Sequence, residues 1–417
     1  MSHNADEAVE ILYRTDWGRI VAALIRITGD FEIAEEAAQE AFASAVHQWR
    51  EAGVPEFPRA WVIQAARHKA IDVIRRKTRF REKLNLYAAN LDEAVLPDEP
   101  EANDIADDRL RLIFTCCHPA LASEAQIALT LRTLGGLQTD EIARAFLVPA
   151  ATMAQRLVRA KRKIRDARIP CVVPATNQLP ERLDSVLTVI YLIFNEGYAA
   201  TSGDSLLRTD LCAEAIRLGR LVRELMAPNP PAEATALLAL MLLQDSRRDA
   251  RLTEAGDLVV LTEQDRARWN HDQIAEALPM VSEAFRGGPG PLAIQASIAS
   301  LHCVAPRSED TDWRQISRLY QMLEQLQPSP VVTLNRAVAI AMAEGPREGL
   351  LLIDELSLHG DLDEYHLLHS ARADLLRRLG APEDAAAAYE RALQLVSNES
   401  ERRFLERRLS EMQLAAR

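Results

Sequence analysis

Apolar side chains recur at helical spacing along this chain, and this periodicity restricts its fold more than any other feature. Between residues 8 and 27 one stripe consists of Val9, Leu12, Tyr13, Ile20, Val21, Leu24 and Ile27. A second stripe, after a good N-cap residue at Asp30, consists of Ile33, Ala37, Ala41, Ala45 and Trp49. Aromatic residues make up only 5% of the chain, which disfavours a β-sandwich or a β-barrel. We therefore predict an all-α protein, and 417 residues suffice for two or three domains.

Charge is distributed unevenly along the chain, whose net charge is −12. Residues 67–83 hold eight basic and two acidic side chains, and residues 156–168 hold seven basic and one acidic. Between them, residues 84–108 hold eight acidic side chains and no Lys or Arg. A single basic run is more often a solvated helix face, but two such runs around an acidic tether favour nucleic-acid binding. Because residues 171–417 carry a net charge of −11, that binding must use local patches.

Residues 109–166 have the pattern of a compact helical unit that contains a helix-turn-helix. A short helix begins near Asp140, the turn covers residues 147–149, and a second helix follows. The predicted buried stripe of this second helix is Met153, Leu157, Ala160 and Ile164. Its opposite side carries Thr152, Gln155, Arg156, Arg159, Arg162 and Lys163. In a DNA-binding unit, Thr152, Gln155 and Arg156 would reach base edges, and residues 159–165 would reach phosphates. An ordinary helical hairpin would show the same apolar stripe, so that alternative stays open.

These segments, taken in order, resemble the extracytoplasmic-function branch of the sigma-70 family of RNA polymerase initiation factors. Asp30–Val46 is similar to the helix with which that family binds core polymerase. Phe57–Arg79, with the pattern AR-x-x-AID-x-x-RR, is similar to the helix that reads and melts the −10 element. Asp140–Arg165 is similar to the helix-turn-helix that reads the −35 element. The family commonly has Gly-Thr-Val-x-Ser-Arg where residues 151–156 of this chain read Ala-Thr-Met-Ala-Gln-Arg. This departure bears on which −35 sequence is read, and not on the role of the helix in reading the −35 element.

The resemblance implies three sets of contact residues. Core polymerase would be bound by Glu32, Glu35, Glu36, Gln39 and Glu40. The −10 element would be bound by Trp61, Arg67, His68, Lys69, Arg75, Arg76, Lys77 and Arg79. The −35 element would be bound by Thr152, Gln155, Arg156, Arg159, Lys161, Arg162 and Lys163. Aromatic residues beside cations suit opened single-stranded DNA, although a tryptophan at helical spacing is more often a core residue.

The rest of the chain predicts a helical extension with a weak internal repeat. We expect these parts in order: a region 2-like domain at 1–83, an acidic linker at 84–108, a region 4-like helix-turn-helix domain at 109–169 and a helical C-terminal regulatory domain at 180–417. Near residues 334–395, Leu334–Leu356 parallels Ser370–Leu393, with Gly345 and Gly380 close to one tetratricopeptide period of 34 residues apart.

As a whole, the chain resembles the sigma-factor subgroup with a tetratricopeptide-like extension. In that subgroup the extension is thought to regulate the factor, and small DGPF/YCII-type proteins are its suspected associates. The opposite charges of the extension and of the basic runs would also let the extension fold back on them at low salt.

Several other functions are disfavoured. Cys116, Cys117 and His118 are adjacent, so on a helix their side chains diverge by about 100° and cannot easily share one metal ion. No phosphate-binding glycine loop, HExxH motif or nucleophile elbow is present. We therefore predict no metal site, no cofactor and no enzymatic activity. Polar runs at 245–251 and 264–269 favour surface ion pairs over a pocket.

The chain is expected to be cytoplasmic. No apolar run reaches the roughly 18 residues that a membrane span requires, and residues 1–10 show no secretory signal. Two alternatives to the sigma factor stay open. One is a helix-turn-helix regulator with a helical sensor domain that does not join polymerase, which would leave the first 80 residues unexplained. The other is a helical-repeat scaffold whose basic runs are incidental.

Overall fold

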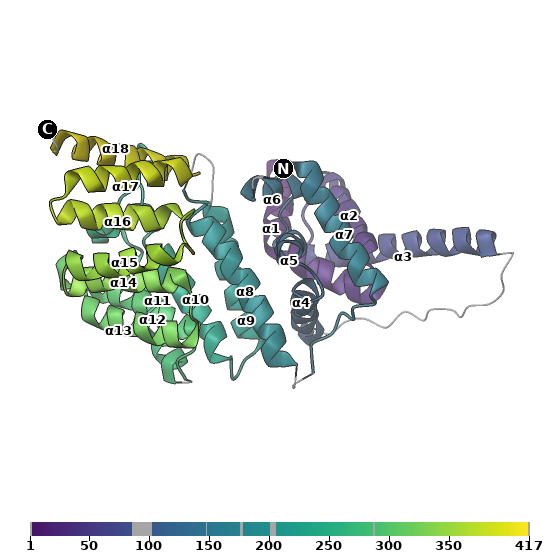
Figure 1. Ribbon diagram of the computed structural model, residues 1–417. Helices are drawn as coiled ribbons and strands as arrows, with labels where there is room; N and C mark the ends of the chain where they lie inside the picture. Colours follow the sequence, from purple (N-terminus) through teal and green to yellow (C-terminus); the bar gives the residue numbers. More distant parts are fainter. Residues whose placement is uncertain are drawn as a thin grey trace. The chain divides into compact units, whose positions relative to one another are not determined.

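A computed structural model describes residues 2–85, 102–146, 148–175, 178–200, 206–286 and 288–415 (Figure 1). Over these ranges the chain forms helices and loops, with no strand beyond an isolated bridge between Leu252 and Leu258. The all-α prediction is thus confirmed. The chain divides into two compact units, Met1–Val189 and Ile190–Arg417. Helix α8 (Leu179–Tyr198) contributes to both units, so the division falls inside a helix rather than at the proline-rich joint before residue 180.

The first unit contains the segments predicted to bind polymerase and DNA. Its helices before α8 are α1 (Ser2–Thr28), α2 (Phe31–Ala52), α3 (Pro58–Asn85), α4 (Ala102–Cys116), α5 (Ser123–Thr133), α6 (Thr139–Ala145) and α7 (Ala150–Asp166). The linker predicted at 84–108 is therefore too long at both ends, because α3 continues to Asn85 and α4 already begins at Ala102. The middle of that linker, residues 86–101, lies outside the described residues.

Helices α1, α2 and α3 pack together along the predicted apolar stripes. The whole second stripe, from Ile33 to Trp49, is buried, and Ile20 and Leu24 of the first stripe are completely buried. The Asp30 carboxylate caps α2 as expected, because it accepts hydrogen bonds from the backbone N–H groups of Glu32 and Ile33 at 2.8 and 3.1 Å. The Asp30 cap thus fixes the start of α2, and the apolar stripe fixes the face that this helix buries.

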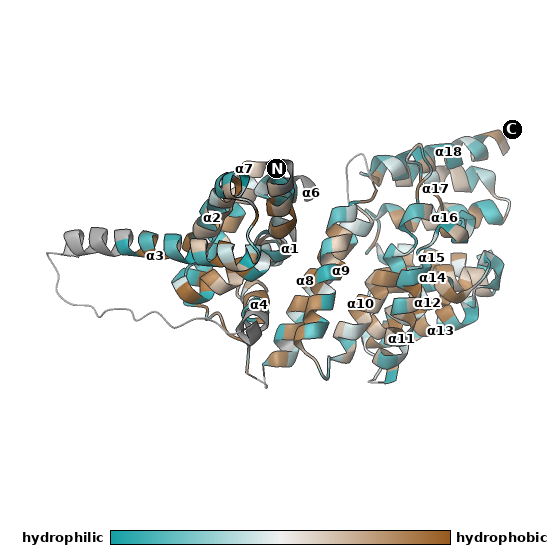
Figure 2. Ribbon diagram, turned by 180° about the vertical axis from the view of Figure 1, so that it is seen from behind, coloured by the Kyte–Doolittle hydropathy of each residue, from teal (hydrophilic) through white to brown (hydrophobic). Residues whose placement is uncertain are grey.

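In the second unit, α8 is followed by a succession of antiparallel helices. They are α9 (Thr209–Leu225), α10 (Ala232–Asp245), α11 (His271–Arg286), α12 (Pro291–Val304), α13 (Trp313–Leu326), α14 (Pro330–Ala343), α15 (Pro346–His359), α16 (His366–Arg378), α17 (Pro382–Leu395) and α18 (Glu399–Ala415). Residues 234–243 of α10 are all buried, because α9, α11 and α12 all pack against this helix. Figure 2 shows the resulting concentration of apolar residues along α8 and around α10.

The predicted repeat region consists of the hairpins α14–α15 and α16–α17, which are stacked with α18 in successive layers (Figure 1). Ala385, Tyr389 and Ala392 of α17 are buried in one cluster with residues of α16 and α18. Gly345 and Gly380 lie between the helices of each hairpin with φ of +136° and +75°, a region that favours glycine. The helical hairpins are therefore present, while their tetratricopeptide assignment stays a prediction.

Candidate nucleic-acid interface

Helix α7 has the two faces that the sequence predicts. Met153, Leu157, Ala160 and Ile164 are its buried residues, and they pack it against α5 and α6. Pro149 precedes the first residue of α7, while Leu147 of the predicted turn lies outside the described residues. The short helix α6 carries Asp140 and Glu141 in its first turn, where the helix dipole favours anions. The local arrangement is a helix-turn-helix whose second helix has one face open.

The open face of α7 holds most of the residues predicted to contact the −35 element. Arg156 is half-buried at the edge of this face, and the exposed members are Thr152, Gln155, Arg159, Arg162 and Lys163. No ion pair joins Arg156, Arg159 or Lys163 to another part of the described chain. Hydroxyl, amide and guanidinium groups in this order can donate to base edges near the helix N-terminus and to phosphates further along.

Lys161 lies away from this open face and contacts the helix predicted to bind polymerase. Its ammonium nitrogen lies 2.7 Å from a carboxylate oxygen of Glu35 in α2, and the two side chains are only 13% and 9% exposed. The guanidinium of Arg132, in α5, lies 3.8 Å from the same oxygen. Two residues predicted to bind different partners, DNA and polymerase, are therefore paired with each other.

The other residues of α2 predicted to bind polymerase form an exposed acidic face, which consists of Glu32, Glu36 and Glu40 together with the neutral Gln39. Glu35 differs from them because it is buried, and its second carboxylate oxygen has no hydrogen-bond partner among the described residues. A buried carboxylate is costly unless cations stand beside it, and here Lys161 and Arg132 provide them. The predicted polymerase-binding set is thus divided between an exposed face and one buried, neutralised member.

Helix α3 presents part of the predicted −10 set on its surface. Val62, Ala66 and Ala70 form its fully buried stripe. His68 and Arg75 are exposed, and Lys69 lies 3.2 Å from the carboxylate of Glu40. Arg67 is half-buried, and the side chains of Arg76, Lys77 and Arg79 lie outside the described residues.

Trp61 has features of both a core residue and a residue that could contact single-stranded DNA. Its ring packs edge-on against the ring of Trp49 at a centroid distance of 5.6 Å, which is typical of a core contact. The residue is nevertheless only half-buried, and it shares one side of α3 with His68 and Arg75 because the three are seven residues apart. A partly open aromatic ring beside cations is suitable for stacking an unpaired base.

The cysteine–histidine segment is held by burial and by a local hydrogen bond. Cys116 and Cys117 are buried, and burial raises the pKa of Cys117 to about 12, so this thiol is protonated at neutral pH. His118 uses Nδ1 to accept a hydrogen bond from the backbone N–H of Ala120. Within the described ranges, no three His, Cys, Asp or Glu side chains are placed to hold one ion. Nor is any helix there long and apolar enough to cross a bilayer.

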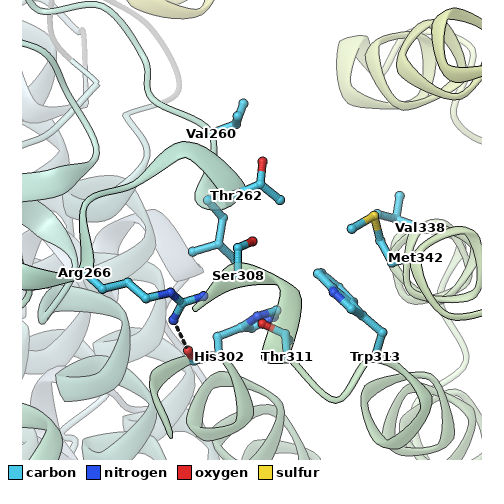
Figure 3. A pocket seen from close by; sticks show the side chains of 10 residues that line it. Val260, Thr262, Arg266, His302, Ser308, Thr311, Trp313, Val338 and Met342 are labelled. Atoms are coloured by element: carbon cyan, nitrogen blue, oxygen red, sulfur yellow. Dashed lines mark hydrogen bonds between the residues drawn. The ribbon is translucent and has the colours of Figure 1, made fainter. Parts of the chain in front are cut away.

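The second unit contains a small cavity of about 190 Å³ beside the start of α13 (Figure 3). Its lining is mainly apolar and includes Val260, Val338 and Met342, and the rings of Trp313 and His302 pack edge to face beside it at a centroid distance of 5.1 Å. Arg266 also lines it, but this guanidinium donates to the main-chain carbonyls of His302 and Ala305. Among the described residues the buried Nδ1 of His302 has no hydrogen-bond partner, so the cavity holds one unpaired polar atom in a mainly apolar lining.

Other residues of the polar run 245–251 contact neighbouring groups inside the second unit. Arg251 stacks on the ring of Tyr198 at 3.7 Å, and Arg247 donates to the hydroxyl of the same tyrosine. Gln273 donates to Asp245 at 2.9 Å. The prediction of surface ion pairs was therefore incomplete, because these cations are mostly packed against rings and main-chain groups.

The cavity histidine makes the stability of the second unit sensitive to acid. Burial and the nearby cations Arg247 and Arg266 lower the pKa of His302 to about 3, from an ordinary value of 6.5. The unfolded chain then binds a proton that the folded unit excludes, so stability is full above pH 6.5 and falls by roughly 1.4 kcal/mol per pH unit below it. We expect His302→Gln to remove about 2 kcal/mol of the loss between pH 7 and pH 5. Urea unfolding of the original chain and of His302→Gln at the two pH values, followed by tryptophan fluorescence, measures this, and an unchanged difference between the two pH values would contradict it.

Comparisons with known proteins agree with the two helical modules. Residues 12–80 match sigma-70 region 2, and residues 111–164 match sigma-70 region 4. Over 179 residues the chain is 27% identical to the probable ECF RNA polymerase sigma factor SigI of Mycobacterium tuberculosis, in two strains. The alignment covers 42% of this chain and 61% of that protein. The chain is an extracytoplasmic-function sigma factor of the sigma-70 family. Proteins of this family are transcription initiation factors, not enzymes.

The extension of this sigma factor is shared with an uncharacterised protein. A protein of Rhizobium meliloti is 44% identical over 399 residues, which cover 94% of this chain and 93% of the relative. Residues 182–285 match a family of unknown function, DUF6596. No solved structure matches this sigma factor significantly. The relative therefore has the same order of modules, including the extension.

Sequence reasoning missed two residues that join the modules, Arg132 and Trp17. Arg132 lies among Leu129, Leu131 and Leu134, and it is only 6% exposed in the structure. Trp17 is 1% exposed and donates from its indole N–H to the carbonyl of Arg132 at 3.1 Å. The available signal for Arg132 was a single cation at the end of the stretch Ile127–Leu131, since such a charge is buried only beside a partner.

Proposed function

We propose that this sigma factor binds core RNA polymerase, recognises −35 and −10 promoter elements and promotes transcription initiation. The observation that carries the proposal is the open face of α7, on which polar and cationic side chains stand opposite a fully buried apolar stripe. The acidic face of α2 and the exposed cations of α3 supply the other two contacts in the order that the family uses. Each surface has the chemistry of its proposed partner, since phosphates attract cations and an acidic face suits a basic groove.

Reconstitution with purified components tests this proposal. We expect the full chain to co-elute with core polymerase in gel filtration and to give discrete run-off transcripts from some promoter fragments. A DNA-binding regulator that does not join polymerase would bind such fragments alone and would not co-elute. Failure to co-elute at low and moderate salt would contradict the proposal.

We also propose that the C-terminal extension regulates this activity. Its net charge of −11 is opposite to that of the two basic runs, so attraction between them would weaken DNA binding at low salt. A chain that ends at Val189, where the first compact unit ends, is expected to bind promoter DNA with polymerase more tightly than the full chain. The difference should shrink as salt rises, in fluorescence-anisotropy titrations. Identical affinity at every salt concentration would remove the regulatory proposal and leave the sigma-factor assignment intact.

Two further proposals concern the surroundings of the protein. We propose that it acts in the cytoplasm, where core polymerase is found, and that a small DGPF/YCII-type protein is an associate of the extension. Both rest on the likeness to the subgroup with such extensions. Co-purification of a small partner with the full chain, but not with a chain that ends at Val189, would support the second.

A further inference from the structure

The cavity beside the start of α13 has an apolar wall that the protein itself covers only in part. Five apolar side chains line it, and each of them is half-buried rather than fully buried: Val260, Leu261, Trp313, Val338 and Met342. They come from α13, from α14 and from the segment that precedes α11, so three separate parts of the second unit converge on one place. A concave apolar surface with a few polar groups is the usual form of a small-molecule site.

A guanidinium stands opposite this apolar wall, and part of its donor capacity is unused (Figure 3). Arg266 donates from Nη1 to the main-chain carbonyls of His302 and Ala305, and it lies 4.4 Å from the ring centre of Trp269. Its Nε and Nη2 donate no hydrogen bond to any part of the described chain. The main chain thus holds the guanidinium in place and leaves the Nε–Nη2 edge for another partner.

No carboxylate of the described residues neutralises this cation. Asp310 is near, but it pairs with Arg307 at 3.0 Å, and the exposed Glu309 forms no ion pair with Arg266. Burial and the neighbouring Arg247 outweigh both acids and lower the pKa of Arg266 from its ordinary value. An anion placed against Arg266 would therefore be favoured.

His302 adds a second polar group on the same side. Its buried Nδ1 has no hydrogen-bond partner among the described residues, and a buried polar atom without a partner is unfavourable. The pKa of about 3 keeps the imidazole neutral at neutral pH, so His302 brings no charge that would replace an anion or repel one. The hydroxyl groups of Ser308 and Thr311 also line the cavity.

Size and shape restrict the ligand further. An apolar cavity of about 150 Å³ holds a benzene molecule, so a cavity of about 190 Å³ admits a single ring with one small substituent. The thioether of Met342 and the ring of Trp313 both interact favourably with an aromatic ring. The Nε–Nη2 edge of one guanidinium matches the two oxygens of a carboxylate, which it can bind through two parallel hydrogen bonds.

We propose that this cavity is a binding site for a small aromatic carboxylate of about the size of benzoate. The carboxylate meets the Nε–Nη2 edge of Arg266, and the ring lies against Trp313, Val338 and Met342. All of these residues belong to the second unit, so the inference does not depend on the proposed function of the first.

Isothermal titration calorimetry on the full chain tests the site with two probes. Benzoate has the ring and the charge, whereas benzyl alcohol has the same ring and no charge. We expect benzoate to bind with a dissociation constant below about 1 mM, which is a reasonable affinity for roughly nine non-hydrogen atoms. Benzyl alcohol should bind at least about tenfold more weakly. Absence of benzoate binding up to about 10 mM, or equal affinity for the two probes, would overturn the proposal.

A matched pair of valine variants tests the location. Val338→Trp fills the cavity from α14, whereas Val331→Trp places the same side chain at a 37% exposed position of the same helix that does not line the cavity. We expect Val338→Trp to weaken benzoate binding at least about tenfold and Val331→Trp to change it less than about twofold. Equal effects of the two substitutions would show that benzoate binds elsewhere.

A matched pair of arginine variants tests the charge. Arg266→Gln should abolish the preference for benzoate over benzyl alcohol, and Arg268→Gln, at an exposed position in the same turn, should keep it. If circular dichroism shows that Arg266→Gln is unfolded, Arg266→Lys replaces it: lysine keeps the charge but cannot form two parallel hydrogen bonds, so benzoate should bind about tenfold more weakly. An unchanged preference in the folded Arg266 variant would overturn the proposal.

Discussion

Replacement of Glu36 and Gln39 by lysine is expected to weaken binding to core polymerase by about 100-fold. Both side chains lie on the exposed acidic face of α2 and are away from the contact between Glu35 and Lys161. Like charges placed across an interface cost several kcal/mol, and a factor of 100 corresponds to about 2.7 kcal/mol. The dissociation constant for full-length protein and core polymerase, measured by biolayer interferometry at fixed salt, checks this.

The same helix offers a matched control. Gln48 and Glu51 are also exposed and also three residues apart, so Gln48→Lys with Glu51→Lys makes the same two exchanges outside the predicted contact set. We expect this control to bind polymerase within about twofold of the original chain, because exposed charges away from an interface have small effects. Equal losses in the two double variants would mean that net charge, rather than the acidic face, governs binding.

Replacement of Arg156 by alanine is expected to change which −35 sequence is used, and not only how well. Arg156 lies near the start of α7, where a recognition helix enters the major groove, and a guanidinium there can bind a guanine edge with two hydrogen bonds. Its loss should cost about 1–3 kcal/mol on the preferred promoter and relax selection at one base pair. Transcription by the reconstituted holoenzyme from promoters varied at each −35 position measures both effects.

Lys163 is the comparison for this second prediction. It lies two turns further along α7, is exposed, and is predicted to meet a phosphate. Lys163→Ala should therefore weaken all promoters about equally and reduce the salt dependence of binding, with no change of preferred sequence. A change of sequence preference in Lys163→Ala and none in Arg156→Ala would place the recognition helix differently from our proposal.

Periodicity was enough to predict the parts of the fold in which one face is apolar and the other charged. The stripe from Met153 to Ile164 identified the buried side of α7, and hence its open side, because the two faces differ so clearly in composition. The capping carboxylate of Asp30 marked the start of α2 for a similarly local reason. Boundaries were less certain: residues 102–108 include three acidic residues and are yet helical, and the last of them, Asp108, is buried beside Arg26 and Arg111.

Contacts between distant segments could not be predicted in this way. Glu35 and Lys161 each lie within a run of like-charged residues that face solvent, and nothing local distinguishes them from their exposed neighbours. Their pairing depends on how α2 and α7 meet across 126 residues of sequence. The same is true of Trp17, which fell outside the predicted stripe of α1 and is nevertheless almost completely buried.

The central claim is that this protein directs core polymerase to start sites through a −35 and a −10 element. The most direct test is transcription by purified core polymerase and the full-length factor on a library of randomised promoter sequences, followed by sequencing of the transcripts. Our account predicts that the transcribed templates share two short motifs at a fixed spacing, and that omission of the factor abolishes them. Transcripts without a common motif, or the same transcripts with core polymerase alone, would contradict it.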